Sequence, residues 1–169
     1  MRILILFIFL LTNSYADGIS GLKNIVVNKE LKKYDSLVFL DEKNKELSLK
    51  NYRGNLILLN FWASWCAPCK EEMPSLDQLQ SNKDLKNLKI FPINVGQDDI
   101  QKASKFFEDL EIKNLQLYFD SPITLAKKFE LRGIPTSILI NKDGFEFARI
   151  YGSINFNDKK FIDWLSNYN

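Results

Sequence analysis

An apolar segment that ends close to the only two cysteines of the chain constrains the fold more than any other feature. Residues 56–61 lack the alternation of apolar and polar residues that marks a half-exposed strand. Such a run is typical of a central strand that is covered on both faces. Cys66 and Cys69 follow, and apolar residues recur at helical spacing over residues 73–79. The sequence therefore predicts a buried strand, a Cys-x-x-Cys turn and a helix, in that order.

The two cysteines have the spacing of a redox-active pair. At the start of a helix, a sulfur lies near unpaired backbone N–H groups and the positive end of the helix dipole, which stabilise a thiolate. The thiolate is the form that attacks disulfides. We therefore assign Cys66 as the nucleophile and Cys69 as the thiol that resolves the mixed disulfide. Pro68 fixes φ and removes one backbone donor between them, so we expect it to influence the redox potential.

Three other interpretations of the cysteine pair remain. A structural zinc site takes four ligands, usually Cys and His, whereas the chain has two cysteines and no histidine. A static disulfide across so short a loop would remove little entropy from the unfolded chain. The two cysteines could also be unrelated buried residues. The motif and its context favour redox chemistry over all three.

The composition argues against several other classes of function. A chain of 169 residues is long enough for one domain with a sizeable core. Its 23 basic and 21 acidic residues give a net charge of +2, which does not indicate a nucleic-acid partner or an acidic substrate. The lack of histidine excludes Cys–His and Ser–His catalysis and haem ligation through histidine. We expect no metal and no cofactor other than a redox-active disulfide.

Residues 1–16 have the three parts of a secretory signal peptide. Arg2 carries the positive charge, an apolar core follows, and Ser14 and Ala16 are small residues ahead of a cleavage site before Asp17. A membrane-spanning anchor needs about 20 apolar residues, and this run is much shorter, although an uncleaved signal would still tether the protein. Export predicts a periplasmic location, where a cysteine pair acts as a reductant only if a donor re-reduces it.

The rest of the chain alternates predicted strands and helices. Residues 17–34 are polar and mixed, and we interpret them as a linker that leads to a short edge element and precedes a folded domain over residues 35–169. Residues 141–144 predict a hairpin turn, and Asp98 or Asp99 is expected to cap a helix. This order indicates an α/β sandwich with a mixed sheet. The expected elements are a hairpin over 37–49, strands over 88–96, 115–119, 137–140 and 145–151, and helices over 100–110, 122–129 and 158–168.

With these features the chain resembles the thioredoxin superfamily, and within it the exported TlpA/ResA-like thiol–disulfide oxidoreductases. The motif at residues 60–69 is a specific match, and the resemblance covers the whole expected domain. It implies a thioredoxin fold: an α/β fold whose mixed central sheet is flanked by helices, here with an N-terminal β-hairpin and an inserted helix–strand segment. Residues 133–136 resemble the family's cis-proline loop. The resemblance implies that Pro135 is cis and packs against a Cys66–Cys69 disulfide, and that the backbone of Ile134 pairs with a substrate strand.

Two positions depart from the patterns of related proteins. Thioredoxins place a buried aspartate under the cysteines, and Asn60 occupies that position here; an amide does not titrate, so another group has to move the proton. Glu72 matches a glutamate of ResA-like proteins, and burial would raise its pKa to a value that suits proton transfer with Cys69. The alternative is a solvated helix glutamate. After Pro135 the chain has Thr136, where cytochrome c maturation members usually carry an acidic residue, so the general TlpA type matches better.

These observations predict an exported, monomeric enzyme that reduces disulfides in specific client proteins. By analogy with the family, the clients would belong to cytochrome c maturation or copper-site assembly, and a membrane electron donor would re-reduce the pair. A peroxidase is an alternative, but the threonine and proline that such sites need ahead of the reactive cysteine are lacking. A redox-inert binding or metallochaperone-like protein is another. The expected catalytic residues are Cys66, Cys69 and Glu72, and the expected substrate contacts are Trp62, Trp65, Pro68, Ile134 and Pro135.

Overall fold

The structure is a computed structural model that describes residues 22–34 and 36–169. The predicted signal peptide, residues 1–16, lies outside the described residues. Strand β4 (Leu56–Trp62) is at the centre of the sheet, and every one of its residues is buried. It pairs in parallel with β5 (Leu88–Asn94) and antiparallel with β7 (Thr136–Ile140). The central strand predicted from the apolar run is therefore confirmed.

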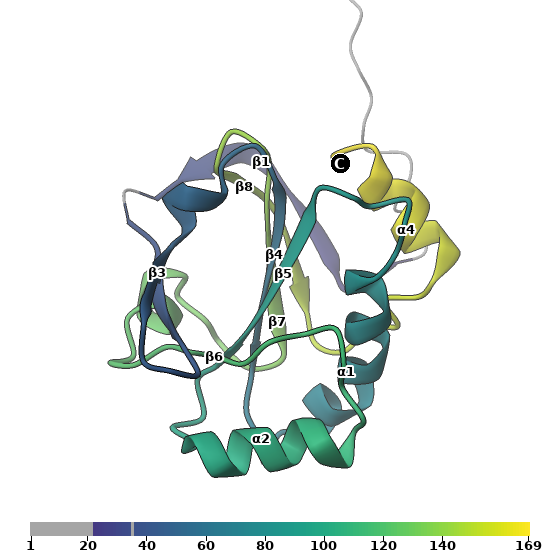
Figure 1. The fold of residues 1–169 in the computed structure, drawn as a ribbon. Coiled ribbons are helices and arrows are strands. Elements are labelled where there is room, and N and C mark those ends of the chain that lie inside the picture. The colour runs from purple at the N-terminus through teal and green to yellow at the C-terminus, as the bar shows by residue number, and fades with distance from the viewer. Residues whose placement is uncertain (1–21, 35) are drawn as a thin grey trace, which may run out of the picture.

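Within the described residues, the strands form one mixed sheet of eight (Figure 1). The other strands are β1 (Ile25–Lys33), β2 (Val38–Asp41), β3 (Glu46–Ser48), β6 (Tyr118–Phe119) and β8 (Phe145–Tyr151). The order across the sheet is β1-β8-β7-β4-β5-β6-β2-β3. The parallel pairs β4–β5 and β5–β6 occupy the middle, and antiparallel pairs extend the sheet on either side. Both predicted hairpins, β2–β3 and β7–β8, are present, and the second turn holds Gly144 at a φ of 84°.

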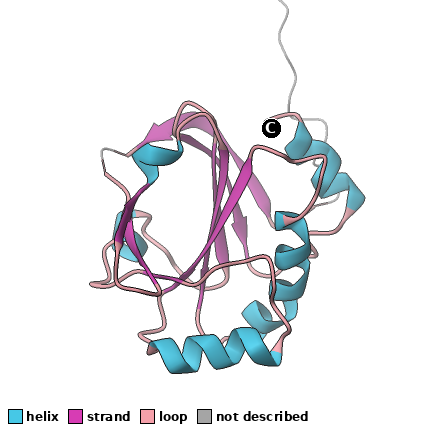
Figure 2. Cartoon of the chain, viewed as in Figure 1, coloured by secondary structure: helices cyan, strands magenta, loops and turns pink. Residues whose placement is uncertain are grey.

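The helices cover the two faces of this sheet (Figure 2). They are α1 (Ala67–Gln80), α2 (Ile100–Asp109), α3 (Leu125–Lys128) and α4 (Lys159–Ser166), and a 3-10 turn, η2 (Leu49–Tyr52), follows β3. Side chains alternate along β4, so Leu58 joins a core with residues of α1, α2 and α4, whereas Leu59 joins a second core with residues of α3. Figure 1 shows α1 and α4 next to each other on one side of the sheet.

The sequence of α1 explains both its start and its buried face. Cys66 is the N-cap and Pro68 lies in the first turn, where its missing N–H costs no helical hydrogen bond. The residues expected to face the core, Met73, Leu76 and Leu79, are all buried, and Pro74 lies inside the helix. At the start of α2, Asp99 is the cap, and its Oδ1 accepts a hydrogen bond from the backbone N–H of Lys102 at 2.8 Å.

The prediction of a linker over residues 17–34 is wrong for most of the residues described there, because they form a strand. Residues 25–33 form β1, which pairs antiparallel with β8 at the edge of the sheet. Apart from Ile25, the side chains of β1 are exposed or only partly buried, so the strand lacks the apolar pattern by which a covered strand is recognised. The folded part of the chain therefore begins well before residue 35, where the sequence placed its boundary.

Two smaller differences concern the region after α2. The strand expected over residues 115–119 is reduced to β6, and at its expected start Asp77 of α1 accepts the backbone N–H groups of Asn114 and Leu115 at 2.7 and 3.0 Å. These donors are therefore not available to a neighbouring strand. In α4, Phe161 and Leu165 are buried as expected and Trp164 is buried with them, whereas Ile162, also expected in the core, is only partly buried. Among the helices of the described residues, none has the length and apolar character needed to cross a bilayer.

Candidate active site

The cysteines lie where β4 ends and α1 begins. The Sγ atom of Cys66 accepts a hydrogen bond from the backbone N–H of Cys69, with 3.3 Å between nitrogen and sulfur. The N–H of Cys66 donates to the carbonyl oxygen of Ala63 at 3.1 Å, which closes the turn. The two sulfurs form a disulfide with an S–S distance of 2.02 Å, as expected. After reduction, the N–H groups of the helix start lie where they stabilise a Cys66 thiolate.

The two sulfurs differ in their access to solvent. Cys66 is 5% exposed, whereas Cys69 is fully buried. Beside them, Trp65 is 66% exposed and Pro68 is also exposed. A second protein can therefore reach this disulfide through Cys66 and not through Cys69.

Glu72 is a buried carboxyl group on the same face of α1 as Cys69, three residues further along. Its Oε1 accepts a hydrogen bond from Nδ2 of Asn60 at 2.7 Å, and its Oε2 accepts one from the N–H of Ile154 at 3.3 Å. Burial raises the pKa of Glu72 to about 7, because desolvation of the carboxylate outweighs the lowering effect of these two hydrogen bonds. The alternative of a solvated helix residue is therefore excluded for Glu72.

Asn60 connects Glu72 to the neighbouring strand. It lies on β4 opposite Ser137 of β7, and its Nδ2 donates to Oγ of Ser137 at 3.0 Å as well as to Glu72. In the described part of the chain, its buried Oδ1 has no hydrogen-bond partner. An amide does not titrate near neutral pH, so Glu72 is the titratable member of this cluster.

The loop before β7 has the predicted cis proline. The peptide bond between Ile134 and Pro135 is cis, and Pro135 is buried. The next residue, Thr136, pairs with Phe61 near the end of β4, so the loop lies beside the segment that leads to the cysteines. Ile134 is partly buried and packs against the hydrophobic core that contains both cysteines. The fold therefore brings Ile134 and Pro135 to the same end of the sheet as the disulfide.

The expectation that Trp62 forms part of a substrate contact is wrong. Its side chain is fully buried, and its ring stacks on Phe106 and Phe107 of α2 with centroid distances of 4.6 and 5.5 Å. Because alternate side chains of a strand point to opposite faces, Trp62 points into the core that α2 covers. Trp65 follows in the turn, outside the strand, and is the exposed tryptophan of the motif.

Asp98 supports the turn before the cysteines, a role that the sequence did not reveal. It accepts the backbone N–H and the hydroxyl of Ser64, each at 2.8 Å, and Nδ2 of Asn94 at 2.8 Å. Burial alone would raise the pKa of Asp98, but hydrogen bonds from Lys102, Asn94 and Ser64 together lower it to about 2. Gly96 lies against the same turn, since a Cβ atom there would be 2.4 Å from Cβ of Ala63. The turn is therefore held from the loop that follows β5.

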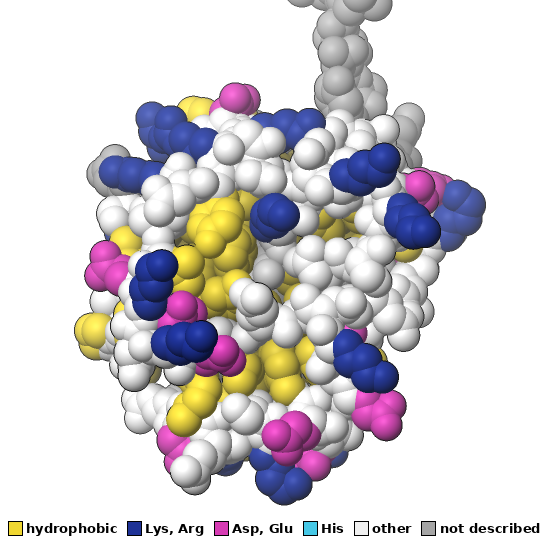
Figure 3. Space-filling view, in the orientation of Figure 1, with side chains coloured by type: hydrophobic (Ala, Val, Ile, Leu, Met, Phe, Trp, Pro, Cys, Tyr) yellow, Lys and Arg dark blue, Asp and Glu magenta, His cyan; other side chains and the backbone are white. Residues whose placement is uncertain are grey.

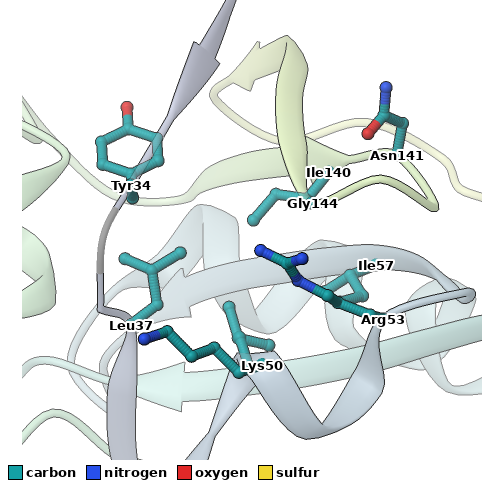
Figure 4. Close-up of a pocket in the computed structure, with 9 residues that line it drawn as sticks. Tyr34, Leu37, Lys50, Arg53, Ile57, Ile140, Asn141 and Gly144 are labelled. Atoms are coloured by element: carbon teal, nitrogen blue, oxygen red, sulfur yellow. The ribbon is translucent and has the colours of Figure 1, made fainter.

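A separate pocket lies at the other end of β4 (Figure 4). Ile57 and Ile140, which pair across β4 and β7, line it, and the side chains of Lys50 and Arg53 lie beside them. Its volume of about 30 Å³ leaves room for little more than a water molecule. None of the site residues predicted from the sequence lines this pocket, so it is not the active site.

A mixed sheet with a disulfide at the start of its first long helix and a cis-proline loop beside it defines a thiol–disulfide oxidoreductase with the thioredoxin fold. Residues 25–145 match the model of the AhpC/TSA family, and the chain belongs to this family of thioredoxin-like proteins. Such enzymes work through the cysteine pair without a separate cofactor. In the residues that the structure describes, no group of three or more His, Cys, Asp or Glu side chains could hold a metal ion.

Known relatives agree with this class. The chain is 30% identical over 155 residues to the thiol-disulfide oxidoreductase ResA of Bacillus anthracis, which covers 89% of this chain and 88% of that protein. A putative thiol:disulfide interchange protein DsbE from Chlorobium tepidum superposes with a TM-score of 0.71 at 21% identity, over 85% of this chain and 99% of that one. StoA from Bacillus subtilis superposes with a TM-score of 0.64 at 24% identity, over 77% and 96%. The structures confirm the fold, and the ResA relatives confirm the expected branch.

Proposed function

We propose that this chain is an exported reductant of disulfides in specific client proteins. Cys66 is the nucleophile, Cys69 resolves the mixed disulfide, and Glu72 exchanges the proton of Cys69. The buried carboxyl group of Glu72 is the observation that carries the proposal. Its pKa of about 7 lies near the working pH of a general acid–base group, and it lies on the same face of α1 as Cys69.

The proposed reaction transfers two electrons from the reduced cysteine pair to the client disulfide. The Cys66 thiolate attacks one client sulfur, a Cys66–client disulfide forms, and the other client sulfur leaves as a thiolate. Cys69 then loses its proton and attacks the sulfur of Cys66, which releases the second client sulfur as a thiolate. The Cys66–Cys69 disulfide is restored, and the client becomes a dithiol when both thiolates take up protons.

Proton transfer is the step that needs a protein side chain. Cys69 is fully buried, so bulk water has poor access to its proton. Glu72 is partly ionised near neutral pH because its pKa is about 7, and it accepts this proton as Cys69 attacks. In the reverse direction, when a donor re-reduces the pair, Glu72 returns a proton to Cys69.

We further propose that the client contacts the surface around Cys66. Trp65 and Pro68 are exposed and supply apolar area, and Ile134 lies partly exposed in the loop on the other side. Within the described residues, the backbone of Ile134 makes no hydrogen bond, so its N–H and C=O groups are available to a client strand. Pro135 is buried and contributes through the shape of the loop.

The location, clients and electron donor complete the proposal. The signal-like pattern of residues 1–16 supports export to the periplasm, with a tether through an uncleaved signal as the alternative. A membrane electron donor would re-reduce the pair, since the compartment is oxidising. The clients would be proteins of cytochrome c maturation or copper-site assembly, and the enzyme would act as a monomer.

The reduction potential tests the direction of electron flow. A reductant of this kind is expected near the value of thioredoxin, about −270 mV. The measurement equilibrates the purified protein with glutathione or dithiothreitol buffers and follows the thiol state by alkylation. A potential near that of DsbA, about −120 mV, would reverse the assignment and make the protein an oxidant.

Trapping of mixed disulfides tests the mechanism and identifies the clients. A Cys69→Ser variant retains the nucleophile but cannot resolve the adduct, so it is expected to accumulate disulfide-linked client proteins through Cys66 when expressed in the exported compartment. A Cys66→Ser variant is the control and is expected to trap none. If Cys69→Ser yields no adducts and the wild-type pair also stays permanently oxidised in the cell, the redox function is wrong.

A further inference from the structure

A groove of about 660 Å³ runs beside the cis-proline loop, between the segment after α3 and the outer strands β1 and β8. At one end Tyr151 pairs with Thr136, the residue after Pro135. The N–H of Gly152 donates to the carbonyl oxygen of Pro135 at 2.9 Å. Arg132 lines the groove from the loop that leads to Pro135. This end of the groove therefore adjoins the cis-proline loop, whose Ile134 packs against the core that contains both cysteines.

The groove concentrates positive charge. Four basic side chains line it, those of Lys32, Lys128, Arg132 and Arg149, against the one acidic side chain of Glu130. The whole chain has 23 basic and 21 acidic residues, so the ratio of basic to acidic side chains is much higher in the groove than in the chain as a whole. On the face drawn in Figure 3, by contrast, basic and acidic side chains lie interspersed. The near-neutral net charge of the chain, which gave no indication of an acidic partner, conceals this local excess.

The base of the groove is a rigid ion pair. Arg149 and Glu146 are both buried, and they bind through two contacts, Nε to Oε1 at 2.7 Å and Nη2 to Oε2 at 2.9 Å. Nη1 of Arg149 donates to the carbonyl oxygen of Phe129 at 2.7 Å, and the hydroxyl of Tyr34 donates to Oε2 of Glu146 at 2.6 Å. The charge of Arg149 is thus balanced, and its role is to hold the groove in shape.

The available charge comes from the rim. Lys32 and Arg132 are exposed and have no acidic partner in the part of the chain that the structure describes. Lys128 is also exposed, and its ammonium group donates to the backbone carbonyl of Ser36, which leaves its charge unbalanced. Three cations against Glu130 give the rim a formal charge of +2 (3 − 1). A partner with several carboxylates therefore complements it.

We propose that this groove binds an acidic segment of the client polypeptide, a few residues away from the client cysteine that reacts with Cys66. The inference rests on the proposed function. Along β8, the groove extends from Tyr151 towards Glu146, which pairs with Lys32 on β1. At about 3.3 Å per residue, this stretch spans about 16 Å and accommodates about five residues of extended chain. A client strand that pairs beside Ile134 continues into the groove past Arg132.

The shape of the groove favours a polypeptide over a membrane surface. Its base, Arg149, is only 8% exposed and lies below a rim of exposed charged side chains, so a flat layer of lipid headgroups touches the rim alone. The half-exposed ring of Tyr151 offers apolar contact to a side chain that enters from the cysteine end. A client strand makes use of the rim, the base and this ring together.

The test compares two synthetic peptides that carry one cysteine as a mixed disulfide with thionitrobenzoate, whose release is followed by absorbance. One peptide has aspartates about three to six residues from the cysteine, and the other has serines there. The wild-type enzyme, reduced beforehand, is expected to react about three- to tenfold faster with the acidic peptide at ~0.01 M ionic strength. This ratio is expected to fall towards one at ~0.5 M salt.

Variants assign the effect to the groove. Lys32→Gln together with Arg132→Gln is expected to bring the ratio of the two rates close to one, and Glu130→Gln is expected to raise it. Lys83→Gln together with Lys86→Gln is the matched control, because these exposed lysines precede β5 at the opposite end of the central strands and do not line the groove. The control is expected to keep the wild-type ratio.

The outcomes separate this inference from the proposed function. If the wild-type enzyme reduces both peptides at the same rate, the groove proposal is wrong and the oxidoreductase function stands. If it reduces neither peptide, both are wrong. If the groove variants keep the wild-type ratio but lose sedimentation with phosphatidylglycerol vesicles, the groove binds an anionic membrane and the client proposal is overturned.

Discussion

Replacing Glu72 by glutamine removes the titratable group beneath the cysteines while keeping its shape. The side chain of glutamine retains an oxygen that accepts the hydrogen bond from Asn60, which joins the two side chains at 2.7 Å. The weaker bond from the N–H of Ile154, at 3.3 Å, is the one that an amide disturbs. We therefore expect Glu72→Gln to fold, to be insensitive to pH at this position, and to resolve mixed disulfides slowly.

The magnitude follows from the difference in pKa between the folded and unfolded states. The pKa of Glu72 rises from an ordinary value of 4.5 to about 7 in the folded protein, chiefly through burial. At about 1.4 kcal/mol per pH unit, this corresponds to about 3 kcal/mol. Between these two values the folded state holds the proton and the unfolded state has lost it. The free energy of unfolding of the wild-type protein therefore falls as the pH rises from 4.5 to 7 and then levels off.

Denaturant unfolding of the oxidised protein measures this difference. Near pH 8, Glu72→Gln is expected to be more stable than the wild type by up to about 3 kcal/mol, whereas near pH 5 the two are expected to agree within about 1 kcal/mol. Glu71→Gln makes the same change of charge at an exposed position of α1 and is expected to follow the wild type at both pH values. Parallel pH profiles for Glu72→Gln and the wild type would refute the argument from burial.

The reduction rate of a model disulfide gives a second readout for the same variant. If Glu72 accepts the proton of Cys69, the rate of insulin reduction near pH 7 is expected to fall about tenfold or more in Glu72→Gln. An unchanged rate would show that another group, or water, takes the proton, even if the stability result holds.

Two further predictions concern the turn before the cysteines. Asp98→Asn replaces one of the two carboxylate oxygens, which accept the N–H and the hydroxyl of Ser64 separately, and is expected to lower the free energy of unfolding by about 1–2 kcal/mol at neutral pH. Because the pKa of Asp98 is lowered to about 2, its contribution is present above its ordinary value of 3.8, and the difference between variant and wild type is expected to disappear as the pH falls to about 2. Gly96→Ala places a Cβ 2.4 Å from Cβ of Ala63 and is expected to cost about 1–3 kcal/mol in thermal or denaturant unfolding. Gly133→Ala is its control, since a Cβ at Gly133 meets nothing within 4 Å, and equal effects of the two substitutions would contradict the packing argument.

The parts of the fold that the sequence predicted are those in which local pattern and burial agree. Apart from Asn60, residues 56–61 are apolar because both faces of β4 are covered, and Cys66 caps α1 at the point where the strand gives way to a turn and a helix. The hairpin turn at Gly144 was recognisable because only a residue that tolerates a positive φ suits that position. Glu72 was found through a resemblance, and only the packing around it establishes that it is buried.

The parts that the sequence did not reveal depend on contacts between distant segments. Trp62 and Trp65 have the same chemistry, and only the end of β4 between them decides which is buried. The sequence offered Asp98 only as a possible helix cap. Its role at the turn was not recognisable, because its hydrogen bonds to Ser64 cross from one loop to another. Nothing in the sequence indicated that Glu146 is buried in a hydrogen-bonded cluster. Its three partners are Asn28 of β1, Tyr34 directly after β1, and Arg149 of β8.

The position of β1 has a practical consequence for anyone who shortens this chain for expression. A fragment that starts at residue 35 would lack the partner of β8, whose backbone N–H and C=O groups would then face water along an open edge of the sheet. It would also deprive the buried carboxylate of Glu146 of the hydrogen bonds from Asn28 and Tyr34. Open edges of this kind template aggregation. A soluble fragment therefore has to begin upstream of Ile25, the first residue of β1.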